Sequence, residues 1–283
     1  MASVNSPIRA ILKPFLFWLL GKTGYKYAQF YGKMRDIKYR LVEEKEMELL
    51  PYFVKSGDTV IDIGANYAYY TDRLSGLVGK AGKVYSFEPI PFTHQICSMI
   101  VKKKKLNNVS LFNKGVSDKN ETLTFKVPKL SFGGVSAGQA HIAGRTNESS
   151  EKKKYYNFEE EESFNCEVVA LDSFGLNELD KLTFVKIDIE GAEYFAMMGM
   201  ENLLKRYQPC LLIEVQPYFL SGFNIAADTF IKYITTDLGY SFFYYDEKIK
   251  KIFPLRQPLF DSNFVLIPTN KIEQYNQIIQ DEA

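Results

Sequence analysis

The sequence predicts an α/β protein built on an open, mostly parallel sheet. From Asp58 onward, short runs rich in β-branched residues alternate with longer stretches that have helical spacing. This is the pattern of strands joined by crossover helices. Two acidic residues, Asp62 and Glu88, lie at the carboxyl ends of the first two strand-like runs. Because parallel strands end at one common sheet edge, we expect a ligand site there.

The expected elements follow in order along the chain. Strands are predicted at 59–63, 84–87 and 109–112, with helices at 67–77 and 91–106 between them. Buried strands at 182–187 and 209–215 flank a helix at 192–206, and two closing strands at 241–245 and 263–267 are joined by a Lys-rich turn and the segment 253–260. Between 117 and 172 we expect inserted strands at 122–127 and 166–171 around a Gly-rich segment, 131–144, of the kind that covers a site.

Composition places the chain among ordinary globular proteins. With 283 residues there is room for one substantial core, which we assign to residues 51–270, between a helical extension, 1–50, and a tail, 271–283. A net charge of +1 gives no basic excess, so no nucleic-acid partner is expected. Three widely spaced cysteines predict neither disulfides nor zinc, and we expect a cytoplasmic protein of undetermined oligomeric state.

The N-terminal segment Ile8–Leu20 is rich in apolar residues and contains Arg9 and Lys13. Its uninterrupted apolar part, Pro14–Leu20, is too short to span a bilayer. We expect a helix that packs on the domain or on a partner. Peripheral membrane contact through residues 8–20 and a targeting role are the alternatives.

The loop Asp62-Ile63-Gly64-Ala65-Asn66 is the first candidate for ligand binding. Gly64 permits a sharp turn and a close approach. A dinucleotide site would need two further glycines, whereas this sequence has Ala65 and Ala68. Glu88 lies 24 residues after Gly64, near the ~20 expected for an acid that binds ribose hydroxyls. The pattern therefore favours a nucleoside that carries a cationic amino acid rather than a pyrophosphate.

Three ordered motifs resemble the FkbM-type methyltransferases: Val60–Asn66, Tyr85–Pro89 and Val185–Glu193. The resemblance runs from about Asp58 to about Gln216. It implies a class I Rossmann-like fold, a three-layer sandwich whose seven-stranded sheet has one antiparallel strand. It also implies S-adenosylmethionine as methyl donor, most often for methylation of an oxygen. The family commonly has a glycine where this chain has Ala68; we expect Ala68 to be helical and benign.

The resemblance also suggests roles for individual residues. Gly64 and Asn66 would contact the methionine part, Glu88 the ribose and Ser117-Asp118 the adenine region, with Asp188 beside the methyl group. The full set of expected cofactor-binding residues is Asp62, Gly64, Ala65, Asn66, Tyr70, Thr71, Glu88, Pro89, Ser117, Asp118 and Asp188.

Methyl transfer to a hydroxyl needs alignment and a group that accepts the hydroxyl proton. Asp188, at a strand end on the same face as Lys186, is the first candidate base, and a cofactor-contact role and a purely structural role are its alternatives. His141 in the Gly-rich segment is a second candidate. A carboxylate acceptor would need no base, and then Lys186 or a Ser or Tyr hydroxyl would act by orienting the acceptor. No metal is expected, although Asp188 with Glu190, Glu193 or Glu214 offers the oxygen ligands that a divalent ion prefers.

The sequence thus favours an O-methyltransferase acting on a small-molecule or glycan acceptor, such as a sugar, glycan or secondary metabolite. Methylation of a nitrogen or carboxylate on a peptide, a catalytically inactive scaffold with the same fold, and an oxidoreductase are the competing functions.

Overall fold

The computed structural model describes residues 7–129, 140–144, 160–176, 178–255 and 262–280, with side chains from residue 14 onward. Its centre is an eight-stranded sheet in the order β11-β10-β12-β9-β8-β1-β2-β3. The part from β9 to β3 is parallel throughout. Its strands are β1 (Thr59–Ile63), β2 (Lys83–Phe87), β3 (Val109–Phe112), β8 (Phe184–Ile187) and β9 (Cys210–Val215). The predicted α/β architecture is confirmed.

The other part of the sheet has one strand more than predicted. β12 (Ser262–Pro268) is antiparallel to β9, and β10 (Tyr240–Asp246) is antiparallel to β12. The additional strand is β11 (Lys251–Leu255), which pairs antiparallel with β10 and forms the edge. We expected this segment to belong to a connection. It pairs because the Lys-rich turn closes a tight hairpin, with Lys250 at φ 56°, and because Ile252 is fully buried.

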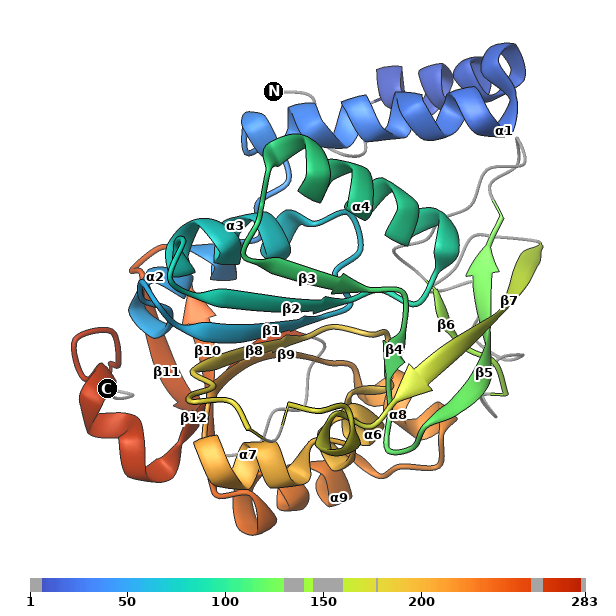
Figure 1. Ribbon diagram of the computed structural model, residues 1–283. Coiled ribbons are helices and arrows are strands. Elements are labelled where there is room, and N and C mark those ends of the chain that lie inside the picture. Colours follow the sequence, from blue (N-terminus) through green and yellow to red (C-terminus); the bar gives the residue numbers. More distant parts are fainter. Residues whose placement is uncertain (1–6, 130–139, 145–159, 177, 256–261, 281–283) are drawn as a thin grey trace.

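Helices cover both faces of the sheet (Figure 1). One face carries α3 (Tyr69–Val78) and α4 (Pro91–Lys104); the other carries α6 (Glu193–Met198), α7 (Glu201–Tyr207), α8 (Pro217–Gly222) and α9 (Ala227–Lys232), followed by the short helix η4 (Tyr233–Asp237). Successive side chains of β1 point to opposite faces of the sheet, and each face has its own hydrophobic core. Val60 packs in the core that contains Leu74 of α3, while Ile61 packs in the core that contains Leu203 of α7. Asp62 therefore lies on the α3 side.

The predicted helix 192–206 is divided into α6 and α7 at Gly199. A Cβ at Gly199 would lie 1.9 Å from the carbonyl oxygen of Ser117, so the chain passes too close here for a side chain. The Asp172 carboxylate, beside the turn η3 (Leu171–Ser173), accepts hydrogen bonds from the backbone N–H groups of Asn202 and Leu203. This caps a new helix start, which is why the single predicted helix is wrong.

A second, four-stranded sheet is inserted beside the carboxyl ends of the parallel strands (Figure 1). It has the order β4-β7-β5-β6 and consists of β4 (Gly115–Val116), β5 (Glu121–Pro128), β6 (His141–Ile142) and β7 (Glu161–Val169). Both inserted strands predicted from alternation are present, although β7 begins earlier than expected. Of the predicted Gly-rich cover, residues 131–139 lie outside the described residues.

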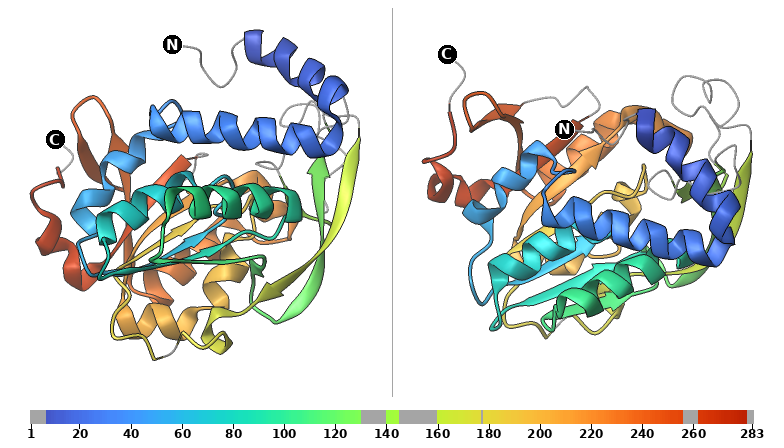
Figure 2. Two further views of the ribbon diagram at one scale, coloured as in Figure 1. Left: turned by 45° about the horizontal axis from the view of Figure 1, so that its top comes forward. Right: turned by 90° about the horizontal axis from the view of Figure 1, so that it is seen from above.

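The N-terminal segment lies across the α4 side of the molecule (Figure 2). Helix α1 (Pro7–Lys38) buries Phe30 against Ile96 of α4, and is followed by η1 (Lys45–Glu48) and α2 (Leu50–Phe53). At the other end of the chain, η5 (Thr269–Tyr275) precedes the buried Ile278. No helix in the described part of the chain is both long and apolar enough to cross a membrane.

Candidate active site

The loop after β1 is held in a left-handed conformation at three positions. Gly64, Asn66 and Ala68 have φ values of 83°, 47° and 65°. The N–H groups of Gly64 and Ala65 both donate to the carbonyl oxygen of Phe87, over 3.0 and 2.9 Å, which ties the loop to the end of β2. Such φ values are uncommon outside glycine and concentrate at functional sites.

Ala68 does not lie in a helix as expected. It precedes the first residue of α3 in the left-handed region, where a side chain costs about 1–2 kcal/mol relative to glycine. Its methyl group is fully buried in a cluster with Phe30 of α1 and Ile96 of α4. Packing against these helices offsets the backbone cost, so the departure from the family pattern is accommodated by the N-terminal helix.

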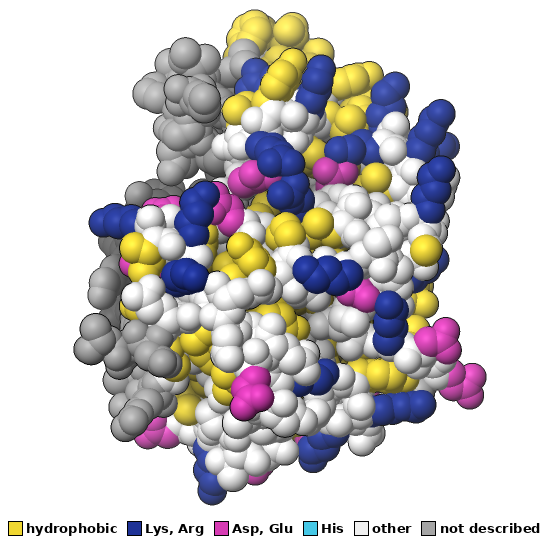
Figure 3. All heavy atoms as spheres, turned by 90° about the vertical axis from the view of Figure 1, so that its left-hand side faces the viewer, with side chains coloured by type: hydrophobic (Ala, Val, Ile, Leu, Met, Phe, Trp, Pro, Cys, Tyr) yellow, Lys and Arg dark blue, Asp and Glu magenta, His cyan; other side chains and the backbone are white. Residues whose placement is uncertain are grey.

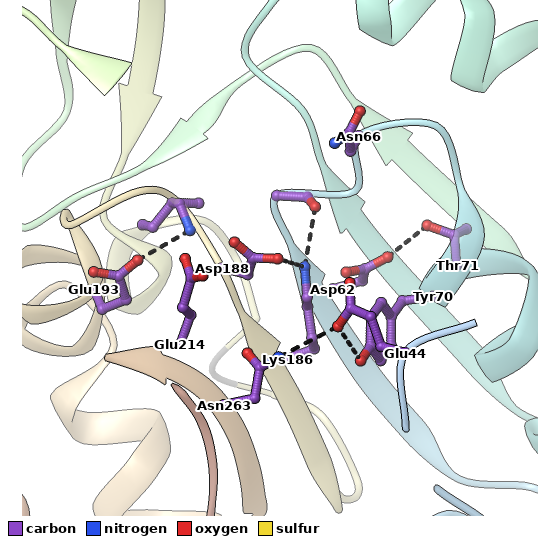
Figure 4. A network of polar contacts seen from close by, with 12 residues as sticks. Glu44, Asp62, Asn66, Tyr70, Thr71, Lys186, Asp188, Glu193, Glu214 and Asn263 are labelled. Atoms are coloured by element: carbon purple, nitrogen blue, oxygen red, sulfur yellow. Dashed lines mark hydrogen bonds and ion pairs between the residues drawn. The ribbon is translucent and has the colours of Figure 1, made fainter. Parts of the chain in front are cut away.

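A buried polar row crosses the centre of the sheet beneath this loop. The register pairs Asp62 of β1 with Ser86 of β2 on one side and with Lys186 of β8 on the other. The Thr71 hydroxyl of α3 donates to Asp62 Oδ2 over 2.6 Å, while Lys186 Nζ donates to Asp188 Oδ2 over 2.9 Å and to the Gly64 carbonyl over 3.3 Å (Figure 4). Lys186 thus connects the two loops that follow β1 and β8.

Lys186 is a permanent cation in this row. Burial alone lowers its pKa, but the negative charges of Asp188, Asp62 and Glu44 outweigh burial and raise the pKa above its ordinary value. Lys186 therefore stays protonated and acts as a hydrogen-bond donor rather than as a base. At Asp62 burial has the larger effect. Full burial raises its pKa, although the charge of Lys186 and the hydrogen bond from Thr71 both act to lower it.

Glu88, directly after β2, accepts a hydrogen bond from the loop that follows β1. Its two carboxylate oxygens accept from the N–H groups of Asn66 at 2.9 Å and Ile90 at 3.0 Å. Burial raises its pKa to about 7 against these hydrogen bonds. The carboxylate also lines the pocket, so its remaining lone pairs can accept hydrogen bonds from ligand hydroxyls.

The loop after β8 is fixed by a carboxylate of its own. Glu190 and Gly191 have φ values of 55° and 99°. The buried Glu193 folds back, and its Oε1 accepts from the N–H groups of Ile189 and Gly191, each at 3.1 Å. Burial raises the pKa of Glu193 to about 7. Glu193 therefore supports the loop that presents Asp188 and does not line the pocket.

Two further carboxylates line the same pocket as Asp188, from elements that the motifs do not include. Glu214, near the end of β9, points toward Asp188 (Figure 4) and accepts from the Gln216 amide over 2.8 Å. Burial, and then the charges of Asp188 and Glu190, raise the pKa of Glu214. Glu44, just before η1, accepts from the Tyr70 hydroxyl at 2.8 Å. In the sequence, the position of Glu214 near the end of a predicted strand indicates a site residue, whereas no sequence pattern indicates Glu44.

These groups meet in one pocket of about 290 Å³. Eight of the residues expected from the sequence line it: Gly64, Ala65, Asn66, Tyr70, Glu88, Pro89, Lys186 and Asp188. The other eight were not expected to bind the cofactor or to act in catalysis, although Glu190 and Glu214 were named as possible metal ligands: Glu44, Tyr69, Ile90, Phe125, Ala140, Ile189, Glu190 and Glu214. Phe125 lies in β5 and Ala140 directly precedes β6, so the inserted sheet forms one wall.

Five expected site residues lie elsewhere. Asp62 and Thr71 are buried behind the loop, and Ser117 with Asp118 follows β4, where the Ser117 hydroxyl donates to Asp118 Oδ1 over 3.2 Å. His141 is buried, with its Nε2 3.7 Å from Glu161 Oε1. Its neighbours Ala140 and Ile142 pack in the apolar cluster of the inserted sheet, so strand alternation directs His141 to the opposite face.

A model of the FkbM methyltransferase domain matches residues 62–242, which is more than half of the chain. The chain belongs to the FkbM methyltransferase family. No curated protein matches. FkbM methyltransferases use S-adenosylmethionine, which is therefore the cofactor of this chain.

Solved structures show limited similarity to this FkbM methyltransferase. The FkbM methyltransferase of Methylobacillus flagellatus is 13% identical over 84% of this chain, with a TM-score of 0.43, and this chain spans only 59% of its length. A methyltransferase of Aquifex aeolicus is 16% identical over 83% of this chain and 97% of its own, with a TM-score of 0.42. A putative methyltransferase of Streptococcus mutans, solved with S-adenosylhomocysteine, is 13% identical over 80% and 97% of the two chains, with a TM-score of 0.41.

The pocket suits this cofactor in charge and in hydrogen bonding. Its described lining has five carboxylates, Glu44, Glu88, Asp188, Glu190 and Glu214, and one cation, Lys186. S-adenosylmethionine carries a sulfonium and an ammonium against one carboxylate, so an acidic pocket attracts it. The buried Oδ1 of Asn66 has no hydrogen-bond partner among the described residues and remains available to a ligand donor. In the same part of the chain, no group of three His, Cys, Asp or Glu is arranged to hold a metal ion.

Proposed function

We propose that this FkbM methyltransferase methylates the oxygen of a hydroxyl group on a sugar, glycan or secondary metabolite. The observation that carries the proposal is the pair of carboxylates, Asp188 and Glu214, that share one pocket while Lys186 is paired with only one of them. S-adenosylmethionine supplies an electrophilic methyl group. The protein must supply alignment and a proton acceptor.

Glu214 is the better proton acceptor of the two. Lys186 Nζ donates to Asp188 Oδ2 over 2.9 Å, so this carboxylate is already engaged as a hydrogen-bond acceptor. Glu214 has no cationic partner in the described structure, and the Gln216 amide is its one described hydrogen-bond donor, so its carboxylate has lone pairs open to the acceptor hydroxyl. We assign Asp188 to holding the reacting groups in line and Glu214 to accepting the proton of the acceptor hydroxyl. Lys186 orients Asp188, and Glu88 binds the ribose.

The acidic lining also discriminates among acceptors. Five carboxylates around one lysine repel a carboxylate acceptor, so formation of a methyl ester is disfavoured. An amine acceptor would be attracted by the same charges, which makes N-methylation the second candidate.

Transfer of a labelled methyl group distinguishes these reactions. The full chain is incubated with labelled S-adenosylmethionine and a cell extract, and products are separated into glycans, peptides and small molecules. The proposal expects a base-stable methyl ether on a glycan or a small molecule. Release of labelled methanol by mild base would show that a methyl ester had formed. Label on a nitrogen atom would show N-methylation. Calorimetry with S-adenosylhomocysteine tests the shared part, since an absence of binding would leave only a scaffold role.

A further inference from the structure

The charge of the chain is divided unevenly between its N-terminus and the remainder. Residues 1–38 contain seven Lys and Arg against a single acid, Asp36, and therefore carry +6. Since the whole chain carries +1, residues 39–283 carry −5. All seven basic residues lie within α1, two of them, Arg9 and Lys13, in its first half, so the positive charge belongs to this helix and not to the methyltransferase domain.

Helix α1 has two parts, separated by Gly21 at φ 61° and ψ −178°. The part after Gly21 is attached to the domain. It buries Tyr25 and Phe30, and Lys26 Nζ donates to the Gln95 side chain of α4 over 3.0 Å. Phe30 packs in the cluster that contains Ala65 of the cofactor loop. This part therefore holds α1 in a fixed position relative to the pocket.

The part before Gly21 presents large apolar side chains to solvent. Trp18, the single tryptophan of the chain, is 79% exposed, and Phe15, Leu19 and Leu20 are 53%, 57% and 43% exposed. We call these four residues the apolar patch. Figure 3 shows hydrophobic side chains gathered at the top of the molecule, where α1 lies, with Lys and Arg side chains beside them. Exposed apolar clusters rimmed by charge mark protein or membrane contacts.

The positive charge of α1 decides whether the apolar patch binds a second protein chain or a membrane. In a symmetric dimer the same patch meets its own copy, so the basic residues nearest to it in the chain, Arg9, Lys13 and Lys22, would be brought close to their counterparts and would repel them. An anionic phospholipid surface has the opposite charge, and each Lys or Arg near it strengthens binding. Tryptophan is also enriched at the headgroup level of bilayers.

We propose that the part of α1 before Gly21 binds the surface of an anionic phospholipid bilayer, with the apolar patch inserted among the headgroups and acyl chain ends. The bend at Gly21 lies beside β7, where Lys22 Nζ is 3.9 Å from Glu162 Oε1. Membrane contact would thus occur next to the inserted sheet that forms one wall of the pocket.

The test uses the full chain and vesicles of two compositions, phosphatidylcholine alone and phosphatidylcholine with phosphatidylserine. Because Trp18 is the only tryptophan, its emission reports directly on the patch. We expect a blue shift and co-sedimentation with the phosphatidylserine vesicles, both weakened by salt. Neither effect depends on the proposed acceptor or on catalysis, so failure here leaves the proposed function unaffected.

Three variants locate the contact. Trp18→Ser with Leu19→Ser should reduce vesicle partitioning at least about tenfold, and Lys13→Gln with Lys22→Gln by roughly fivefold per charge. Ile249→Ser is the matched control, since Ile249 is 47% exposed and lies between Lys248 and Lys250; it should bind as the parent does. Unchanged melting temperature and S-adenosylhomocysteine binding establish that each variant is folded.

Two results would overturn the proposal. One is Trp18 emission and sedimentation that do not respond to phosphatidylserine vesicles. The other is vesicle binding that the Trp18→Ser, Leu19→Ser variant retains in full. Concentration-dependent dimerisation that this variant abolishes, without any vesicle binding, would identify a second copy of the chain as the occupant instead.

Discussion

The carbonyl oxygen of Asp188 occupies the space that a side chain on Gly64 would need. A Cβ built on Gly64 would lie 2.0 Å from that oxygen. The loops after β1 and β8 therefore approach each other as closely as their backbones allow, and Lys186 donates to both of them. The cofactor loop and the loop of Asp188 form one unit, whose geometry can be tested from either side.

Gly64→Ala should abolish measurable binding of S-adenosylhomocysteine. The added methyl group must displace the Asp188 loop, and left-handed backbone adds a cost of about 1–2 kcal/mol. Gly57→Ala is the matched control, because Gly57 has φ 84° but no atom within 4 Å of the added Cβ. Gly57→Ala should lose only the stability that the left-handed backbone costs, and calorimetry should show normal binding of S-adenosylhomocysteine. Equal binding by both variants would contradict the close approach of the two loops.

Lys186→Met should destabilise the protein by about 3–5 kcal/mol, since it leaves buried carboxylates without their cation. Lys181→Met removes a comparable contact, 2.8 Å from Lys181 Nζ to Asp58 Oδ1, but Lys181 has a half-exposed side chain. That variant should cost about 1 kcal/mol or less. Urea unfolding of both variants at pH 7 measures the difference. A cost for Lys186→Met no larger than for Lys181→Met would show that Lys186 does not neutralise the buried row.

Binding of S-adenosylhomocysteine should weaken as pH falls below about 7, because protonation of Glu88 removes the charged acceptor for ribose hydroxyls. We expect about tenfold weaker binding at pH 5.5 than at pH 8. Glu88→Gln should bind weakly at all pH values and lose this dependence, whereas Glu193→Gln should keep it. Calorimetry across this range is the measurement. A dependence that survives in Glu88→Gln would assign it to another group.

Glu193 should make the protein more stable at low pH than at neutral pH. Its pKa in the folded protein, about 7, lies above the ordinary value of 4.5, so the folded state binds the proton more tightly. The stabilising contribution is fully present below pH 4.5 and is lost as pH rises through 7, by about 3 kcal/mol at most. In Glu193→Gln, whose amide oxygen can accept the same two hydrogen bonds, this part of the pH dependence should vanish from urea titrations at pH 5 and pH 8.

Glu214→Gln should reduce kcat by about 10²–10⁴-fold while leaving the affinity for S-adenosylhomocysteine within a factor of about two. His141→Asn provides the comparison, since the sequence also nominates His141 as a base and the structure places it away from the pocket lining. That variant should retain kcat at temperatures below its melting point. A large loss of kcat in His141→Asn, with Glu214→Gln active, would reverse the assignment.

Local pattern was a good guide to the parallel part of the sheet. Strand 109–112 was predicted with its observed bounds, and Asp62 and Glu88 were placed correctly at the ends of β1 and β2. These elements are encoded by runs of neighbouring residues. Ala68 and Gly199 were misjudged because their conformations depend on distant partners: Phe30 and Ile96 for one, the carbonyl oxygen of Ser117 for the other.

The sequence by itself determined the fold class, the family and the loop that follows β1, because strand periodicity, a turn glycine and a strand-end acid are local signals. Only the tertiary structure decided how the pocket is completed. Glu44 precedes the domain motifs and Glu214 follows them, yet packing brings both to the pocket of Asp188. Contacts between residues far apart in the chain leave no spacing in the sequence, and the charge that surrounds a site is the sum of such contacts.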